Sequence, residues 1–158
     1  VMPNKRWPIE NYVGLIRKIT SEALCKVVLI GSVDERNLIS DIREQCPQCH
    51  DATSLTLGQA AALLKKCSLF IGNDSGPLHI ASSMGVPTLS FYGPTSPHDW
   101  APPEKNAISL YKQVECSPCY NHGKFPECDH LNCLKSITVD EAWDTVSRQL
   151  VKLNSVAS

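Results

Sequence analysis

The sequence lacks three features that would place it in common protein classes. Positive and negative side chains nearly cancel, to a net charge of −1 at pH 7, so no broad basic surface can hold nucleic acid or anionic lipid. Apolar runs such as residues 27–30 are short, and none approaches the ~18 residues that a membrane-spanning helix needs. No charged segment followed by an apolar one opens the chain, and no internal repeat is present. We therefore expect no nucleic-acid partner, no transmembrane segment and no export signal.

The length and composition that remain suit one ordinary domain. The chain has 158 residues, and 42% of them are hydrophobic, which is enough for a normal core. It begins with Val1 rather than methionine, which suggests a piece of a longer protein. We expect residues 1–158 to form a single domain with a Cys-rich loop at residues 112–136.

Short apolar runs that predict strands alternate with amphipathic segments that predict helices. Strands are expected at residues 27–30, 52–55, 68–72, 87–92 and 107–111, and helices at residues 8–24, 32–46, 57–67, 77–84 and 139–153. The first strand is wholly apolar, which predicts burial on both faces. This order predicts an α/β fold, a Rossmann-like parallel sheet with helices on both faces. Residues 92–135 lack periodicity and are expected to form long loops around one short strand.

The sharpest chemical signal lies where the 68–72 strand gives way to a helix. Ser75 can cap that helix, Pro77 suits its first turn, and Gly76 lets a ligand approach the backbone. The backbone amides from Ser75 to Leu78 would then sit at the positive end of the helix dipole, at the carboxyl edge of the sheet. Such a position favours an anion such as a diphosphate.

Two side chains flank this junction. His79, one helical turn in, can donate a hydrogen bond to a phosphate oxygen. Asp74 would repel a phosphate, so it is expected to accept hydrogen bonds from sugar hydroxyls or to hold the turn. Two alternatives stay open: the junction can be capped for stability alone, and His79 can be a hydrogen-bonded core residue.

Several segments together resemble the C-terminal domain of the ADP-heptose:lipopolysaccharide heptosyltransferase family. Residues 73–81 (Asn-Asp-Ser-Gly-Pro-Leu-His-Ile-Ala), 85–88 (Gly-Val-Pro-Thr) and 92–97 (Tyr-Gly-Pro-Thr-Ser-Pro) carry most of the likeness. Residues 5–8 (Lys-Arg-Trp-Pro), Gly31-Ser32 with Glu35, and residues 55–57 (Leu-Thr-Leu) agree in order and spacing. The resemblance runs from about residue 5 to residue 150.

The resemblance implies half of a GT-B glycosyltransferase, a family with two Rossmann-like domains and the active site between them. This chain would be the nucleotide-sugar-binding half of an inverting enzyme that transfers heptose to the lipopolysaccharide inner core. The general base would lie in the N-terminal acceptor domain, which is expected to be absent here. The chain alone should therefore bind the donor weakly and should not catalyse.

The resemblance also assigns roles to residues. Lys5 and His79 would stabilise the leaving diphosphate, and Glu35 would accept hydrogen bonds from the ribose hydroxyls. Leu55 and Thr56 would line the nucleoside pocket. The residues expected to surround the diphosphate and the donor sugar are Asp74, Ser75, Gly76, Pro77, Leu78 and His79. As alternatives, Lys5 and Glu35 can be ordinary surface charges, and Trp7 is expected in the core.

The expected partners are ADP-heptose as donor and the lipid A–core oligosaccharide as acceptor, the latter bound through the absent domain. No cofactor is required, and the expected location is the cytoplasm, peripherally at the inner face of the inner membrane. Two other hypotheses remain. One is a different sugar-nucleotide enzyme of the same fold, either another glycosyltransferase or an epimerase. The other is a non-catalytic metal-binding or redox module.

Four of the eight cysteines, Cys116, Cys119, Cys128 and Cys133, fall in the irregular segment, near His122 and His130. Two close pairs around one loop suit a structural zinc ion. Free or partly oxidised thiols and an iron–sulfur cluster are the alternatives. Residues 46–50 (Cys-Pro-Gln-Cys-His) match the haem-attachment pattern, but haem attachment needs an exported chain, and we assign no haem.

Overall fold

The computed structural model describes residues 2–121 and 123–156, which divide between two compact units. Unit 1 consists of Val1–Pro8 and Leu64–Thr138, and unit 2 consists of Ile9–Leu63 and Val139–Ser158. Helices and strands alternate along most of the chain, and every paired strand of the two sheets is parallel to its neighbour. The predicted α/β class is therefore confirmed.

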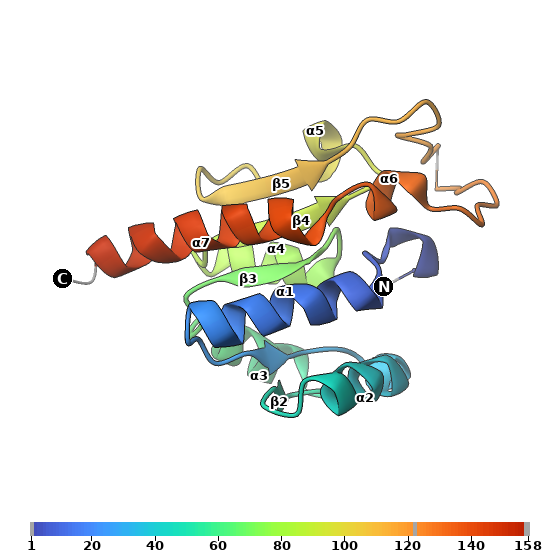
Figure 1. Ribbon diagram of the computed structural model, residues 1–158. Coiled ribbons are helices and arrows are strands. Elements are labelled where there is room, and N and C mark those ends of the chain that lie inside the picture. Colours follow the sequence, from blue (N-terminus) through green and yellow to red (C-terminus); the bar gives the residue numbers. More distant parts are fainter. Residues whose placement is uncertain (1, 122, 157–158) are drawn as a thin grey trace. The chain divides into compact units, whose positions relative to one another are not determined.

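Unit 1 is built on a three-stranded parallel sheet in the order β3-β4-β5 (Figure 1). Its strands are β3 (Phe70–Asn73), β4 (Thr88–Tyr92) and β5 (Ala107–Tyr111). Its helices are the 3₁₀ turn η1 (Pro3–Lys5), α4 (Gly76–Ser83), α5 (Pro97–Trp100) and α6 (Asn132–Lys135). Helix α4 connects β3 to β4 and packs against both. Every residue of β4 is buried, as expected for a central strand of a parallel sheet.

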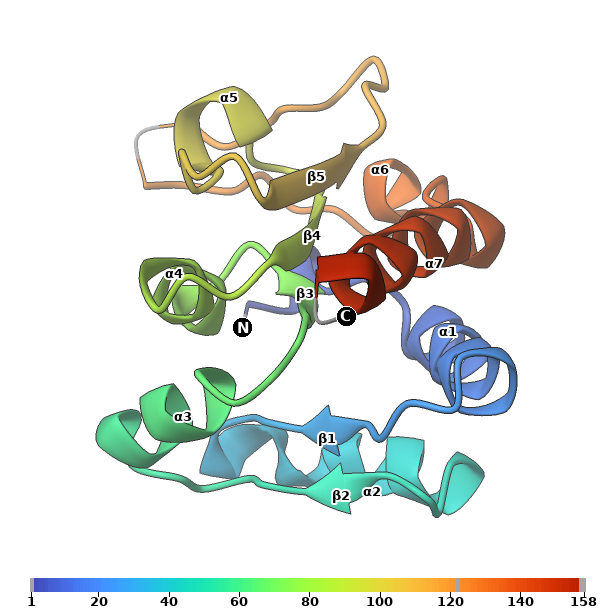
Figure 2. The ribbon, with the colours of Figure 1, turned by 90° about the vertical axis from the view of Figure 1, so that its left-hand side faces the viewer.

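Unit 2 holds a two-stranded parallel sheet, which Figure 2 shows beside α2. Its strands are β1 (Val28–Leu29) and β2 (His50–Asp51). Its helical elements are α1 (Ile9–Glu22), η2 (Val33–Glu35), α2 (Arg36–Gln45), α3 (Leu57–Leu64, whose last residue opens unit 1) and α7 (Val139–Val156). Helix α1 packs against both α7 and α2.

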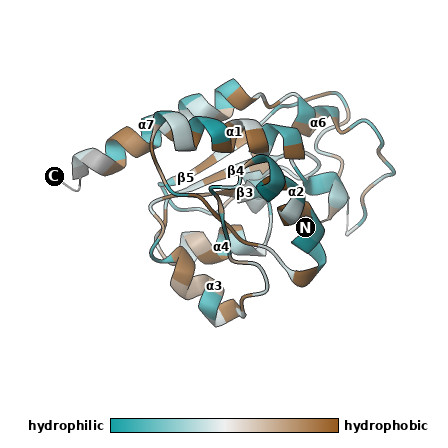
Figure 3. Cartoon of the chain, turned by 60° about the horizontal axis from the view of Figure 1, so that its bottom comes forward, coloured by the Kyte–Doolittle hydropathy of each residue, from teal (hydrophilic) through white to brown (hydrophobic). Residues whose placement is uncertain are grey.

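Burial of one apolar stripe explains why residues 9–22 are helical. Val13, Leu15, Ile16 and Ile19 recur at helical spacing and are all buried. Figure 3 shows hydrophobic and hydrophilic residues alternating along α1 and α7. Val13 and Ile16 join a cluster with Ile42, Cys46 and Cys49, so the cysteines of the haem-like pattern are core residues.

Helix α4 ends where the sequence predicts. Gly85 has a φ of +78°, in the left-handed region that favours glycine. Its amide donates to the carbonyl of Ser82 at 2.9 Å, and the amide of Val86 donates to that of Ala81 at 3.1 Å. These bonds satisfy carbonyls at the helix end and turn the chain into β4.

Two predictions for unit 2 are wrong in detail. Val28, in the strand expected to be buried on both faces, is 36% exposed. The second strand lies at His50–Asp51 rather than at residues 52–55. Parallel hydrogen bonds do continue beyond it, from the amides of Ala52 and Ser54. The strand ends because the Asp51 carboxylate accepts bonds from the amide and hydroxyl of Thr53, which bend the chain locally.

No helix in the described part of the chain is long and apolar enough to cross a membrane.

Replacing Gly93 with alanine is expected to destabilise unit 1. A Cβ atom at this position would lie 2.6 Å from Cγ of Leu134 and 2.9 Å from Sγ of Cys133, both of which are buried. We expect Gly93→Ala to lower the free energy of unfolding by roughly 1–3 kcal/mol, measured by denaturant titration. Gly58→Ala is the control, because a Cβ there meets nothing within 4 Å. An equal effect of both variants would contradict the prediction.

Tyr92, the last residue of β4, is expected to make stability depend on alkaline pH. It is fully buried, and burial together with the nearby Asp74 carboxylate raises the pKa of its phenol to about 12. In the unfolded chain this phenol ionises near pH 10, so the unfolded state binds fewer protons between pH 10 and 12. Stability should therefore fall across this window by up to roughly 2–3 kcal/mol. Chemical denaturation of Tyr92→Phe should show a shallower fall, and identical slopes would contradict this reading.

Candidate functional site

The predicted anion-binding junction lies in unit 1, between the end of β3 and the start of α4. Pro77 lies in the first turn of the helix, as predicted. Gly76 is exposed, and a Cβ atom placed on it would meet nothing within 4 Å. The backbone at Gly76 is therefore open to a ligand from outside.

Two details of this junction differ from the prediction. Ser75 occupies the N-cap position, but its hydroxyl donates to the carbonyl of Asn73 at 3.1 Å and makes no capping bond to the helix. The amide of Leu78 is not free, since it donates to the carbonyl of Ser75 at 3.1 Å. Pro77 has no amide proton. Of the expected amides from Ser75 to Leu78, only the first two can serve an anion.

Asp74 is the electrostatic centre of the site. Only 4% of this residue is exposed, and its carboxylate forms an ion pair with the ammonium group of Lys5. It also accepts a hydrogen bond of 2.7 Å from the hydroxyl of Thr95. Nε2 of His79 lies 4.0 Å from Oδ1 of Asp74, while the His79 side chain is 48% exposed. The carboxylate thus orders Lys5 and Thr95, and His79 remains accessible to solvent.

Trp7 places Lys5 beside this carboxylate. The Trp7 ring is buried and stacks on Phe91 of β4 at a centroid distance of 4.1 Å. Its indole N–H donates to the carbonyl of Ile137 at 2.9 Å, and its backbone amide donates to Oδ1 of Asn73 at 2.8 Å. Trp7 is therefore a core residue, as the sequence predicts, and it anchors residues 3–8 against β3 and β4.

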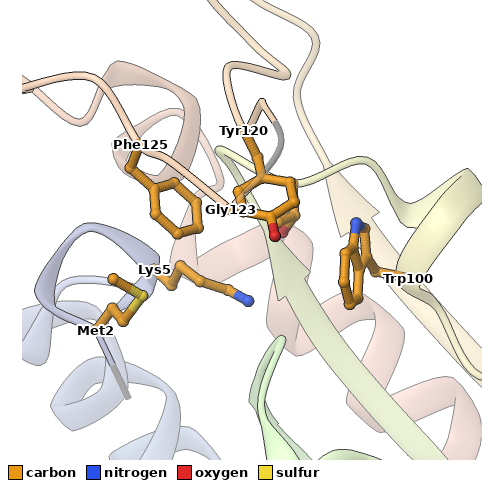
Figure 4. A pocket seen from close by; sticks show the side chains of 7 residues that line it. Met2, Lys5, Trp100, Tyr120, Gly123 and Phe125 are labelled. Atoms are coloured by element: carbon orange, nitrogen blue, oxygen red, sulfur yellow. The ribbon is translucent and has the colours of Figure 1, made fainter.

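The segments that follow β4 and β5, together with residues at η1, line an aromatic pocket of about 220 Å³ in unit 1 (Figure 4). Its lining consists of Met2, Lys5, Thr95, Trp100, Tyr120, Gly123 and Phe125. Among these residues, the sequence predicts a role only for Lys5. Thr95 belongs to the Tyr-Gly-Pro-Thr segment that carries the family resemblance. Its place in that motif could have identified it as a site residue. Nothing in the local sequence identifies the aromatic residues, because separate loops bring them together.

The three remaining predicted site residues lie in unit 2. The carboxylate of Glu35 accepts hydrogen bonds from the amide and hydroxyl of Ser32, at 3.1 and 3.2 Å, and so forms a capping box. Thr56 and Gln59 bond reciprocally at the start of α3, and Leu55 is exposed. Their part in nucleoside binding, together with the residues of unit 1, stays a prediction.

The cysteines of the 112–136 loop lie close enough to influence one another's pKa. Burial raises the pKa of the Cys119 and Cys133 thiols, and Coulombic repulsion from Cys116 and Cys128 raises both further. Within residues 2–121 and 123–156, no three His, Cys, Asp or Glu side chains are arranged to hold a metal ion. Nε2 of His130 lies 3.7 Å from Sγ of Cys128, and His122 lies outside the described residues. Zinc binding therefore stays a prediction.

Curated proteins similar to this chain are heptosyltransferases. Lipopolysaccharide heptosyltransferase 2 of Escherichia coli (strain K12) is 36% identical over 118 residues, which cover 71% of this chain and 33% of that protein. Lipooligosaccharide heptosyltransferase 2 of Haemophilus influenzae is 31% identical over 119 residues, covering 72% of this chain and 34% of that protein. The chain thus spans about a third of the length of these relatives.

Solved structures with a similar fold agree with these sequence matches. The E. coli ADP-heptose lipopolysaccharide heptosyltransferase II superposes with a TM-score of 0.76 at 27% identity, covering 95% of this chain and 43% of that one. A family 9 glycosyl transferase from Veillonella parvula gives 0.78 at 27% identity, covering 96% and 44%. A profile of the family described as glycosyltransferase family 9 (heptosyltransferase) matches residues 1–129. The chain therefore belongs to glycosyltransferase family 9, the heptosyltransferase family.

Proposed function

We propose that this chain is the donor-binding part of an inverting glycosyltransferase that transfers heptose from ADP-heptose to the lipopolysaccharide inner core. The observation that carries the proposal is the open backbone at Gly76, at the start of α4, together with the Lys5 ammonium and the His79 ring that lie by the neighbouring Asp74 carboxylate. A helix start with a nearby cation is suited to a diphosphate. Membership of the heptosyltransferase family supports the choice of heptose as the sugar.

The residues of unit 1 would act on the leaving group. When an acceptor hydroxyl attacks the anomeric carbon, the bond to the diphosphate breaks and negative charge grows on its oxygens. The ammonium of Lys5, which keeps donors beyond its bond to Asp74, and the ring of His79 would stabilise that charge more strongly in the transition state. The proton of the acceptor hydroxyl needs a general base, which we assign to the acceptor domain of the whole enzyme.

The proposed acceptor is the lipid A–core oligosaccharide, bound through that second domain. Since the reaction would join a water-soluble nucleotide sugar to a lipid-anchored saccharide, we place it in the cytoplasm, at the inner face of the inner membrane. A different sugar-nucleotide enzyme of the same fold would share the diphosphate site but prefer another nucleotide. A non-catalytic metal or redox module would bind no nucleotide.

Titration with ADP and with UDP tests the donor site. Chemical shifts of the backbone amides of Gly76 and His79 detect weak binding and locate it. We expect both amides to shift with ADP at lower concentrations than with UDP. Preference for UDP would favour another sugar-nucleotide enzyme, and no shift with either nucleotide would contradict the donor site.

Lys5→Met and His79→Ala are expected to weaken ADP binding. A hydrogen bond to a charged group contributes roughly 1.5–3 kcal/mol, so loss of Lys5 should raise the dissociation constant about tenfold to a hundredfold. The effect of His79→Ala should be smaller, since the His79 side chain is 48% exposed and water weakens its interaction with a phosphate. Lys105→Met removes an exposed lysine of the same unit and is the matched control. Equal affinities of all three variants would disprove the assignment.

A metal analysis of the purified chain tests the zinc hypothesis. We propose that Cys116, Cys119, Cys128 and Cys133 hold a structural zinc ion that orders the loop, with no part in catalysis. Elemental analysis after preparation under reducing conditions should find about one zinc per chain. Cys116→Ser should release the metal, whereas Cys25→Ser, at a cysteine of unit 2, should retain it. Absence of metal from the unaltered chain, with all eight cysteine thiols titratable after unfolding, would disprove the proposal.

A further inference from the structure

The aromatic residues of the pocket in unit 1 have no part in the proposed diphosphate chemistry, although the pocket shares Lys5 with the residues that carry that chemistry. Lys5 lines the pocket and also pairs with Asp74, and Thr95 lines it and also bonds to Asp74. Figure 4 shows the Lys5 side chain pointing into the space between the aromatic residues. A ligand in the pocket would therefore lie close to Asp74, within the strand–helix junction proposed to bind the diphosphate.

The walls of the pocket are aromatic rings that are not stacked face to face. Trp100 and Tyr120 meet edge to face, with centroids 5.6 Å apart and planes at 85°. Tyr120 and Phe125 are tilted by 43° at 4.8 Å. Trp100, the last residue of α5, lines the pocket and is 42% exposed. Ring surfaces so placed can contact the apolar C–H face of a ligand.

The polar groups of the pocket suit hydroxyl groups rather than an isolated ion. The charge of the Lys5 ammonium is compensated by Asp74, yet this group has three protons and can donate further bonds. The Thr95 hydroxyl donates its proton to Asp74, so its lone pairs remain to accept a bond. A ligand that both accepts and donates hydrogen bonds, and carries no net charge there, satisfies both groups.

Size and ring geometry narrow the choice of ligand. The pocket, at about 220 Å³, is smaller than the ~300–1,000 Å³ pockets that hold drug-sized ligands, so it suits one ring. A nucleobase held between two rings needs parallel faces, and the 85° angle between Trp100 and Tyr120 provides no such slot. A sugar ring offers both the apolar face and the hydroxyl groups.

We propose that the pocket lined by Lys5, Thr95, Trp100, Tyr120 and Phe125 binds a single sugar ring through aromatic stacking. The inference rests on the proposed function, because it deepens the same site by extending it from the diphosphate to a saccharide. The ring can belong to the donor sugar or to the terminal sugar of the acceptor. Both would present the same chemistry beside the diphosphate.

Binding of three probes to the full chain tests the proposal: ADP, ADP-heptose and a lipid-free, heptose-containing core oligosaccharide. Trp100→Ala and Tyr120→Ala should each weaken binding of a sugar-bearing probe by about threefold to tenfold and leave ADP unchanged. Trp100→Phe, which keeps a ring, should restore most of the affinity. Met84→Ala removes an exposed apolar side chain of unit 1 outside the pocket and should change nothing. Circular dichroism establishes that each variant is folded.

The outcomes distinguish a donor sugar from an acceptor sugar, and they test the sugar pocket separately from the donor-binding function. Weaker binding of ADP-heptose supports a donor-sugar pocket, and weaker binding of the oligosaccharide alone supports an acceptor-sugar pocket. Unchanged binding of both sugar-bearing probes, or equal weakening of ADP and ADP-heptose, overturns the sugar pocket. If the chain ignores ADP but binds the oligosaccharide through Trp100, the pocket stands and the donor function fails. Binding of none of the probes overturns both.

Discussion

The buried carboxylate of Asp74 is the constraint on which the site depends. A carboxylate that is almost completely removed from water is unfavourable unless charged and polar partners surround it. Lys5 and Thr95 provide those partners, and they come from segments about 70 residues before and 20 residues after Asp74. The requirement to compensate one charge therefore joins three distant parts of the chain. Trp7 makes this arrangement rigid, because its ring is fixed by Phe91 and Ile137.

This arrangement separates two tasks within unit 1. The open backbone at Gly76 offers amides and the positive end of α4, which suit negative charge. The aromatic pocket offers ring surfaces and compensated polar groups, which suit a neutral ring. Lys5 belongs to both, since its ammonium pairs with Asp74 and its side chain lines the pocket. A sugar joined to a diphosphate combines the same two chemistries in one molecule.

Local pattern predicted the elements that a short, mostly apolar run or a turn residue marks in the sequence. The strand at residues 107–111 and the left-handed glycine after α4 lie where the sequence places them. The burial of individual residues was harder to predict than the positions of the elements. Val28, for example, belongs to an apolar run and is nevertheless partly exposed. The hydrogen bonds of Ser75 and Leu78 also differ from the simplest capping pattern, since the serine hydroxyl has a competing acceptor at Asn73. Neither partner choice can be read from spacing alone.

The α/β class, the position of the strand–helix junction at residues 73–79 and, through the motifs, the family all follow from the amino-acid sequence alone. Those features follow from periodicity, turn residues and short-range order, which are all written along the chain. The folded chain alone reveals that Asp74 pairs with Lys5 and Thr95, and that Trp100, Tyr120 and Phe125 line one pocket. Contacts between residues far apart in the chain form because burial and charge compensation bring them together, and no local pattern encodes that choice of partners.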